Sequence, residues 1–143
     1  MDVEITEEPA PPSFAAPLAA LSSLSTDRSS PAWKVRATKR VTIDDPYMRG
    51  HFPGLSIYPG VFILETLRQA VASAVGSERC WPEIRCVRSA RFLAPLVPGD
   101  LLVVTFNVTQ TAAHGVFDVD ATCMREDAKS VARLKVCFEI PDE

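Results

Sequence analysis

Residues 61–75 read VFILETLRQAVASAV, an apolar segment interrupted by a few polar residues at helical spacing. A helix with this composition is apolar on nearly all sides and has to be buried over most of its surface. Its polar residues Glu65, Gln69 and Ser73 stand at i, i+4 and i+8, so they line one stripe of the helix. Gly76 follows as the expected C-terminal cap. The segment therefore predicts a central buried helix with one polar stripe.

Segments with strand character surround this helix. Trp33 to Ile43 alternates apolar with polar residues, as a half-solvated strand does. Four further strands are predicted at about 84–94, 101–110, 115–124 and 130–140, separated by turn residues at 98–100, 114–115 and 126–127. Residues 47–59 hold too many prolines and glycines for regular structure and are interpreted as an irregular loop.

One long apolar helix followed by antiparallel strands predicts an α+β domain in which an antiparallel sheet wraps around a long central helix, the hotdog fold. A small sheet of this kind leaves an exposed edge and an incompletely covered helix. We therefore expect a homodimer or a larger oligomer that continues the sheet.

Residues 1–31 differ from the rest of the chain. They hold five of the twelve prolines, many Ala and Ser, and five acidic residues against one basic residue. Such a composition buries little apolar surface, so we expect a disordered or loosely docked acidic leader at 1–31 and the folded domain at 32–143. Removal of the leader should then leave folding nearly unchanged. Phe14, Leu18, Leu21 and Leu24 recur at helical intervals, so a short docked helix after Pro17 is the alternative.

Charge and composition exclude several functions. The formal net charge is −3 and no Lys/Arg run is present, so a nucleic-acid or anionic-membrane partner is not expected. No apolar stretch approaches the roughly 20 residues of a membrane helix, and the acidic start is unlike a signal peptide. Four cysteines lack Cys-x-x-Cys spacing, so we expect no metal, reduced thiols that are mostly buried in strands, and a cytoplasmic location.

The loop and helix start, residues 50–69, read GHFPGLSIYPGVFILETLRQ. This segment resembles the beta-hydroxyacyl-acyl-carrier-protein dehydratases of the FabZ type, which show Gly-His-Phe-Pro, then Pro-Gly-Val, then a helix with Glu and a Gln four residues later. Residues 91–100, RFLAPLVPGD, resemble a second segment of that family. The resemblance covers about residues 33–140. One departure is Ser56, where the family usually has a further proline.

The resemblance implies dehydration of a beta-hydroxyacyl thioester, carried on the phosphopantetheine of an acyl carrier protein, with no metal or other cofactor. His51 suits the base that removes the alpha proton, because an unperturbed histidine titrates near neutral pH. Glu65 suits the acid, on the argument that an apolar helix desolvates it and keeps it protonated. The backbone N–H of Gly60 at the helix N-terminus suits the oxyanion donor. In the family, His and Glu come from opposite subunits of a dimer.

Other residues have weaker assignments. Gln69 is expected to orient Glu65 from one turn away, or to satisfy nearby backbone. Glu65 has a structural alternative, an ion pair with Arg68. His114 beside Gly115 is interpreted as a surface turn. An acyl tunnel, with ordinary core packing as the alternative for each member, is predicted from five apolar residues: Phe52, Leu55, Tyr58, Phe62 and Phe92.

Three alternative functions remain. A hotdog thioesterase shares the fold, but it does not need the His-Phe-Pro loop. A MaoC-type hydratase generally has a histidine shortly after an Asn-Pro pair, and residues 44–48 (DDPYM) lack it. A non-catalytic module that binds an acyl carrier has no reason to retain both His51 and Glu65. The motif leaves open whether the pathway is fatty-acid or polyketide biosynthesis, although the acidic leader favours a specialised system.

Overall fold

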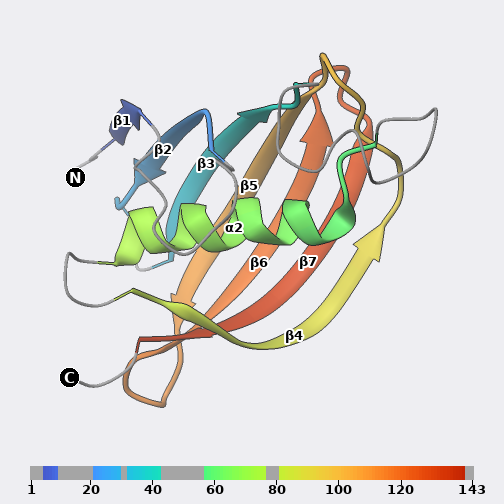
Figure 1. The fold of residues 1–143 in the computed structure, drawn as a ribbon. Coiled ribbons are helices and arrows are strands. Elements are labelled where there is room, and N and C mark those ends of the chain that lie inside the picture. The colour runs from blue at the N-terminus through green and yellow to red at the C-terminus, as the bar shows by residue number, and fades with distance from the viewer. Residues whose placement is uncertain (1–4, 10–20, 30–31, 43–56, 77–80, 141–143) are drawn as a thin grey trace.

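The computed structural model describes residues 5–9, 21–29, 32–42, 57–76 and 81–140. Within these ranges a single antiparallel sheet of seven strands has the order β1-β2-β3-β5-β6-β7-β4. One helix, α2 (Gly60–Val75), crosses one face of this sheet (Figure 1). The strands are β1 (Ile5–Pro9), β2 (Ser23–Asp27), β3 (Trp33–Arg40), β4 (Glu83–Phe92), β5 (Leu101–Gln110), β6 (Val116–Arg125) and β7 (Ser130–Glu139).

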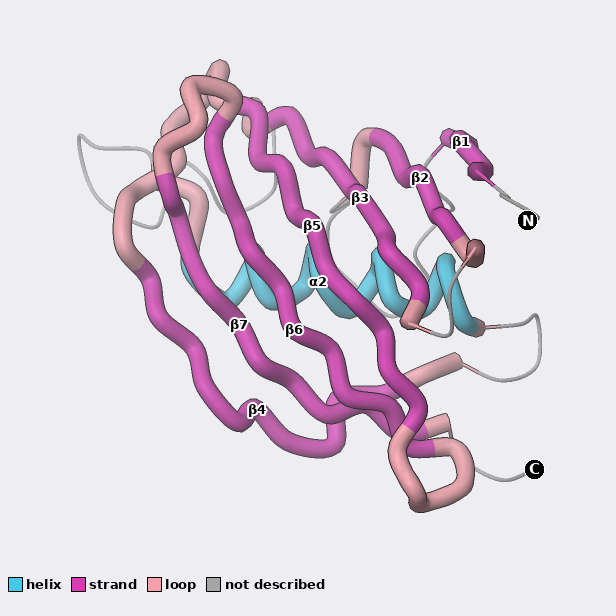
Figure 2. The backbone as a smooth tube through the Cα atoms, turned by 180° about the vertical axis from the view of Figure 1, so that it is seen from behind, coloured by secondary structure: helices cyan, strands magenta, loops and turns pink. Residues whose placement is uncertain are grey.

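The strands form where side chains alternate between the core and solvent. In β5, Leu102, Val104, Phe106 and Val108 are buried and the residues between them are partly or fully exposed. This period of two places one face of the sheet against the helix and the other face outside. Figure 2, drawn from behind, shows the helix on the far side of the strands. All five strands predicted from the sequence are confirmed, with ends that differ by at most three residues.

Helix α2 begins one residue before the predicted start, because Pro59 in extended conformation precedes it and the Phe62 and Ile63 N–H groups donate to the Pro59 carbonyl. It ends at the predicted position. The Gly76 N–H donates to the Ala72 carbonyl, and the backbone of Gly76 is extended rather than left-handed. A Cβ at this position would lie 2.4 Å from the Ala72 oxygen, so the close approach explains the glycine.

A single apolar core joins the helix to the concave side of the sheet. Its fully buried side chains come from α2 and from strands β3, β5, β6 and β7, with further contributions from the loops. The largest of them are Tyr58, Phe106, Phe138, Leu67, Leu96, Leu102 and Leu134. The core therefore fixes the buried side of α2 and leaves the opposite side of the helix away from the sheet.

The expectation of a disordered or loosely docked leader is wrong for residues 21–29. Strand β2 pairs with β3 in register, and β1 pairs with β2. Leu21 and Leu24 belong to the core, with 4% and 2% of their surface exposed. The Arg28 guanidinium donates to the Ala74 carbonyl in the last turn of α2 at 3.0 Å and lies over the Trp33 ring. A cation at a helix C-terminus is favourable, so this segment also secures the helix.

The physical reason for this error is non-local. Leu21 and Leu24 are three residues apart, which fits a helix as well as a docked segment, and the flanking Ser and Thr residues gave no strand pattern. Pairing with β3 supplies the hydrogen bonds that fix β2. Phe14 and Leu18, which completed the helical alternative, lie outside the described residues.

The three turns predicted at 98–100, 114–115 and 126–127 are present, and they connect β4 to β5, β5 to β6 and β6 to β7. Gly99 and Gly115 have positive φ values of 99° and 73°, conformations that favour glycine. The Val97 N–H donates to the Asp100 carboxylate, closing the first turn. His114 is exposed in the turn between β5 and β6, as predicted.

Strand β4 is the edge of the sheet next to β7, and almost all of its residues are exposed. Cys86 lies on this strand and is exposed, so the prediction of buried strand cysteines holds for Cys123 and Cys137 but not for Cys86. Cys80 lies outside the described residues. The exposure of Cys86 follows from the position of its strand at the edge, which the sequence pattern does not reveal.

Candidate active site

The start of helix α2 presents the backbone N–H groups of Gly60 and Val61, which have no acceptor inside the helix. In an α-helix the first N–H groups have no acceptor inside the helix, and they lie at the positive end of its dipole. Gly60 is the first helical residue, and a Cβ on it would lie only 3.0 Å from the edge of the Phe92 ring. A larger residue at position 60 would push the Phe92 ring aside by a few tenths of an ångström, so glycine favours this close packing. The structure brings together two predicted site residues, Gly60 and Phe92, that are far apart in the sequence.

Glu65 lies one and a half turns further along α2 and is held by two side chains. The Arg68 guanidinium donates to both carboxylate oxygens, from Nε at 2.8 Å to Oε2 and from Nη2 at 2.6 Å to Oε1. The Gln69 amide donates to Oε1 at 3.1 Å. Hydrogen bonding to Glu65 is the main cause that raises the pKa of Arg68. The carboxylate thus has a fixed orientation on the helix.

These contacts realise both structural expectations for Glu65, the ion pair with Arg68 and the hydrogen bond from Gln69. They also correct the surroundings assumed for it. Glu65 and Arg68 keep 20% and 23% of their side-chain surface exposed, and the carboxylate has a cationic partner. The argument that an apolar environment alone keeps the proton on Glu65 does not apply. The spacing of three residues between Glu65 and Arg68 was the available signal for this pair.

The polar stripe of the helix extends inward from Glu65. Gln69 is buried, and Ser73 lies one turn beyond it with an Oγ atom that is buried and has no hydrogen-bond partner in the described part of the chain. Glu65, Gln69 and Ser73 therefore form the stripe predicted from their spacing, and Gln69 is its most buried member.

The face of α2 that carries Glu65 is the one turned away from the sheet. Val61, Leu64 and Arg68 stand at i−4, i−1 and i+3 from Glu65 and are partly or fully exposed, Val61 with 65% of its surface. Residues on the opposite side, such as Leu67 and Val71, are fully buried. The candidate site is therefore open on the side where a loop, a substrate or a second subunit can approach.

Three of the apolar residues predicted to line a tunnel are described, and they differ in how deeply they are buried. Tyr58 is a core residue with 2% exposure, and its hydroxyl lies 3.3 Å from the Thr66 hydroxyl. Phe62 packs edge to face on Tyr58, with ring centroids 5.6 Å apart. Phe92 is half exposed at the helix start. Core packing accounts for Tyr58, and Phe92 is the member of the set that has an open surface beside the candidate site.

His51, Phe52 and Leu55 lie outside the described residues, and so does Ser56, where the sequence departs from the family pattern. Their roles stay predictions. The structure fixes the helix side of the candidate site, which consists of Gly60, Glu65, Arg68 and Gln69.

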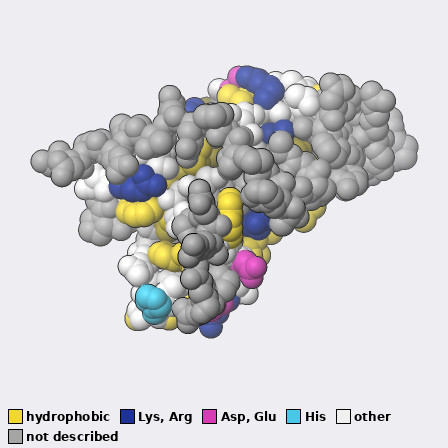
Figure 3. Space-filling model, turned by 60° about the vertical axis from the view of Figure 1, so that its left-hand side comes forward, with side chains coloured by type: hydrophobic (Ala, Val, Ile, Leu, Met, Phe, Trp, Pro, Cys, Tyr) yellow, Lys and Arg dark blue, Asp and Glu magenta, His cyan; other side chains and the backbone are white. Residues whose placement is uncertain are grey.

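The described part of the chain contains no group of three His, Cys, Asp or Glu side chains arranged to hold a metal ion. None of its helices is long and apolar enough to cross a bilayer. On the face drawn in Figure 3, Lys and Arg side chains are scattered and do not gather into one patch.

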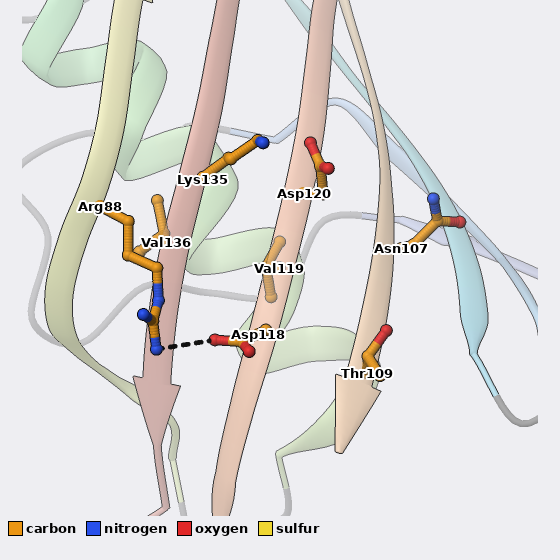
Figure 4. A pocket seen from close by; sticks show the side chains of 8 residues that line it. All are labelled: Arg88, Asn107, Thr109, Asp118, Val119, Asp120, Lys135 and Val136. Carbon is orange, nitrogen blue, oxygen red and sulfur yellow. Dashed lines mark ion pairs between the residues drawn. The ribbon is translucent and has the colours of Figure 1, made fainter. Parts of the chain in front are cut away.

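A shallow pocket of about 370 Å³ lies on the outer face of the sheet, behind which α2 is seen in Figure 4. Its polar lining mixes both charges, from Arg88, Lys135, Asp118 and Asp120. It contains no residue of α2. The pocket is therefore separate from the candidate site.

A long buried helix with an antiparallel sheet wrapped around it defines the hotdog class, and the solved structures agree. The structure of the dehydratase heterocomplex ApeI:P from Xenorhabdus doucetiae is similar with a TM-score of 0.58, over 80% of this chain and 93% of that chain, at 13% identity. The ApeI-like family, described as ApeI dehydratase, matches residues 26–133. The chain belongs to this dehydratase family.

Curated relatives carry the FabZ name. A 3-hydroxyacyl-[acyl-carrier-protein] dehydratase FabZ of Erwinia tasmaniensis is 37% identical over 112 residues, 71% of this chain and 74% of that protein. Another, from a Wolbachia strain of Drosophila simulans, is 40% identical over 90 residues, 60% of this chain and 62% of that protein. The chain thus spans somewhat less than two thirds of the latter relative's length. The family resemblance inferred from the loop and helix motif is confirmed.

Proposed function

We propose that this protein removes water from a beta-hydroxyacyl thioester carried on an acyl carrier protein and produces the trans-2-enoyl thioester. His51 is the base for the alpha proton, Glu65 the acid for the departing hydroxyl, and the Gly60 N–H the donor to the thioester carbonyl. The FabZ and ApeI dehydratase names of the relatives support this assignment.

The observation that carries the proposal is the arrangement on α2. Glu65 is oriented by Gln69 and lies five residues after Gly60, a separation of about 7.5 Å along the helix axis. A thioester carbonyl and a hydroxyl two carbons away can bridge such a span with a hydrogen bond at each end. The helix therefore offers an oxyanion donor and a carboxyl group on one scaffold, as the elimination requires.

Arg68 adds a step to this mechanism. The guanidinium of Arg68 donates to both oxygens of the Glu65 carboxyl group, where the substrate hydroxyl has to bind. In our proposal the bound substrate separates Arg68 from Glu65, while Gln69 keeps the carboxyl oriented. His51 removes the alpha proton, Glu65 protonates the hydroxyl, and water leaves.

The proposal includes a homodimer in which His51 of one subunit meets Glu65 of the other. Strand β4 is a ten-residue unpaired edge, and it carries exposed apolar side chains at Val87 and Phe92. The free side of a long edge strand presents a row of backbone N–H and C=O groups that a partner strand can pair with. Pairing of two β4 edges by a two-fold axis continues the sheet and brings a second subunit towards the open side of α2.

The proposed partners are therefore an acyl carrier protein and a second copy of the chain, with the substrate on phosphopantetheine and no metal or redox cofactor. We place the protein in the cytoplasm, where thiols stay reduced. The free thiols of Cys86, Cys123 and Cys137 are consistent with this location. The pathway is fatty-acid or polyketide-type biosynthesis.

The direct test uses a panel of beta-hydroxyacyl carrier-protein substrates of different chain length and both hydroxyl configurations. Mass spectrometry of the carrier protein should show loss of one water from at least one of them. Release of the free acid would instead indicate the thioesterase alternative. Unchanged substrates across the panel, with binding to the carrier protein, would indicate a non-catalytic module.

A further inference from the structure

Two cysteines that are 51 positions apart in the sequence face each other across neighbouring strands. Cys86 of β4 and Cys137 of β7 are direct partners in the antiparallel register. Cα atoms of such partners lie about 4.5–5.5 Å apart, which falls within the roughly 4.4–6.8 Å range found in disulfides. The backbone therefore holds the two residues at a separation that a disulfide can bridge.

The two side chains also share one face of the sheet. In β7, Leu134, Val136 and Phe138 are buried in the core, so the intervening Lys135 and Cys137 lie on the outer face. A residue directly opposite on the neighbouring strand points to the same side. Cys86 therefore projects from the outer face beside Cys137, and it is exposed.

Irregular pairing surrounds this pair. The register shifts between Ile84 and Cys86 and again between Val87 and Ser89, which leaves Arg85 and Arg88 without partners in the ladder. Such bulges bend a strand and redirect side chains. Figure 4 shows the Arg88 side chain reaching from β4 along β7 towards Asp118 of β6, with an ion pair of 3.3 Å.

Arg88 lies close to the two cysteines. A side-chain interaction with Cys137 is the main cause that raises the pKa of Arg88, followed by the charge of Asp118 and the proximity of Cys86. Cys137 itself is buried, although Lys135 and Glu139 on the same face of β7 are exposed.

We propose that Cys86 and Cys137 form a reversible disulfide when the folded protein meets oxidised glutathione or a similar small disulfide. The exposed Cys86 thiol attacks the oxidant first, which gives a mixed disulfide with glutathione and releases one reduced glutathione. Cys137 then attacks the Cys86 sulfur, forms the Cys86–Cys137 bond and releases the second reduced glutathione. Two thiols are oxidised and one oxidised glutathione is reduced, so the exchange balances. This modification site does not depend on the dehydratase activity.

The test uses the full-length folded protein. After incubation with oxidised glutathione, free thiols are blocked with iodoacetamide and the protein is digested with trypsin without reduction. Cleavage after Arg85, Arg88 and Lys135 places each cysteine on its own short peptide. Mass spectrometry should show these two peptides joined, and dithiothreitol should separate them.

Single-residue variants separate the two steps, the mixed disulfide on Cys86 and the attack by Cys137. Cys137→Ala should stop the reaction at the mixed disulfide on Cys86, and Cys86→Ser should leave Cys137 unmodified. Cys123→Ser is the matched control and should not change the cross-link, because burial raises the pKa of Cys123 to about 12 and keeps its thiol protonated. Circular dichroism checks that each variant is folded.

Three outcomes would overturn the proposal. They are alkylation of both cysteines after treatment of the folded wild-type protein, a cross-link that joins Cys80 or Cys123 instead, and a joined Cys86–Cys137 peptide that appears only after unfolding.

Discussion

At the scale of single residues, Glu65 is defined by its partners. Arg68 and Gln69 approach the carboxylate from the same helix at three and four residues, so the local backbone geometry alone aligns the three side chains. Arg68 donates to both carboxylate oxygens, whereas Gln69 donates a single hydrogen bond to Oε1. The two contacts therefore have different parts in the proposed chemistry, Arg68 before substrate binding and Gln69 throughout.

The first prediction at this scale concerns the acid and the base. Substitution of His51→Ala or Glu65→Gln should lower turnover on the order of a hundredfold or more, the usual contribution of general acid–base catalysis. Steady-state kinetics on the best carrier-protein substrate measures the loss, and circular dichroism checks the fold. His114→Ala is the control, because His114 is exposed in a turn and should keep wild-type activity. Full activity of either single variant would remove that residue from the mechanism.

The second prediction concerns Gln69. Loss of its hydrogen bond to Glu65 in Gln69→Ala should lower turnover about tenfold, since groups that orient a functional side chain typically contribute one to two orders of magnitude. The change should appear in kcat more than in KM, because Gln69 acts on the carboxyl and not on the substrate. Ser73→Ala is the matched control on the same stripe. Equal losses for both variants would point to a packing effect.

At the scale of elements, strand β2 docks part of the N-terminal segment onto the domain. Leu24 packs in the core, Thr26 is buried as well, and Arg28 reaches the last turn of α2. This strand thus supports the helix that carries Glu65, although it contributes no residue to the candidate site. The segment is a structural part of the domain from residue 21 onward.

The third prediction tests this role. Leu24→Ala should lower the free energy of unfolding by about 2–5 kcal/mol, the usual range for a leucine removed from a core. Chemical denaturation measures it. Ser25→Ala, the next residue on the opposite face of β2, should change stability by less than about 0.5 kcal/mol. If Leu24→Ala matched Ser25→Ala, the docking of β2 would be wrong.

The elements show which features a sequence reveals and which it does not. The apolar character of α2 and the alternation in β3 and β5 are local patterns, and they predicted these elements to within three residues. Strand β2 depends on pairing with β3, and the exposure of Cys86 depends on the place of β4 at the sheet edge. Both are set by contacts between distant segments, so the spacing of Leu21 and Leu24 or of the cysteines could not show them.

The candidate site also combines residues placed by a local pattern with a contact that depends on distant segments. Gly60, Glu65 and Gln69 were predictable because one helix carries them at fixed intervals, and Arg68 follows from the same spacing. The packing of Phe92 on Gly60 depends on a distant strand end reaching the helix, and apolar type alone did not distinguish it from the core residue Tyr58.

At the scale of the whole molecule, the proposed second subunit would cover the open side of α2 and pair with the free edge of β4. Val87 lies in the middle of that edge with 42% of its surface exposed. The fourth prediction is that Val87→Lys converts the dimer into a monomer, since a charge at a strand edge opposes pairing. Sedimentation should show the change in mass, and turnover should fall with the dimer fraction.

The control for this variant is Val97→Lys, because Val97 is similarly exposed but lies in the loop after β4. It should stay dimeric and active. A wild-type protein that is monomeric and fully active at assay concentration would contradict the dimer itself.

The most direct measurement of the shared site is the activity of mixed dimers. His51→Ala and Glu65→Gln subunits, each inactive and folded, are mixed in equal amounts under conditions of subunit exchange. Random exchange makes half of the dimers mixed, and each mixed dimer has one intact site of its two, so about one quarter of wild-type activity should return. If mixed dimers form, as native mass spectrometry would show, and remain inactive, then His51 and Glu65 do not combine across the subunit interface.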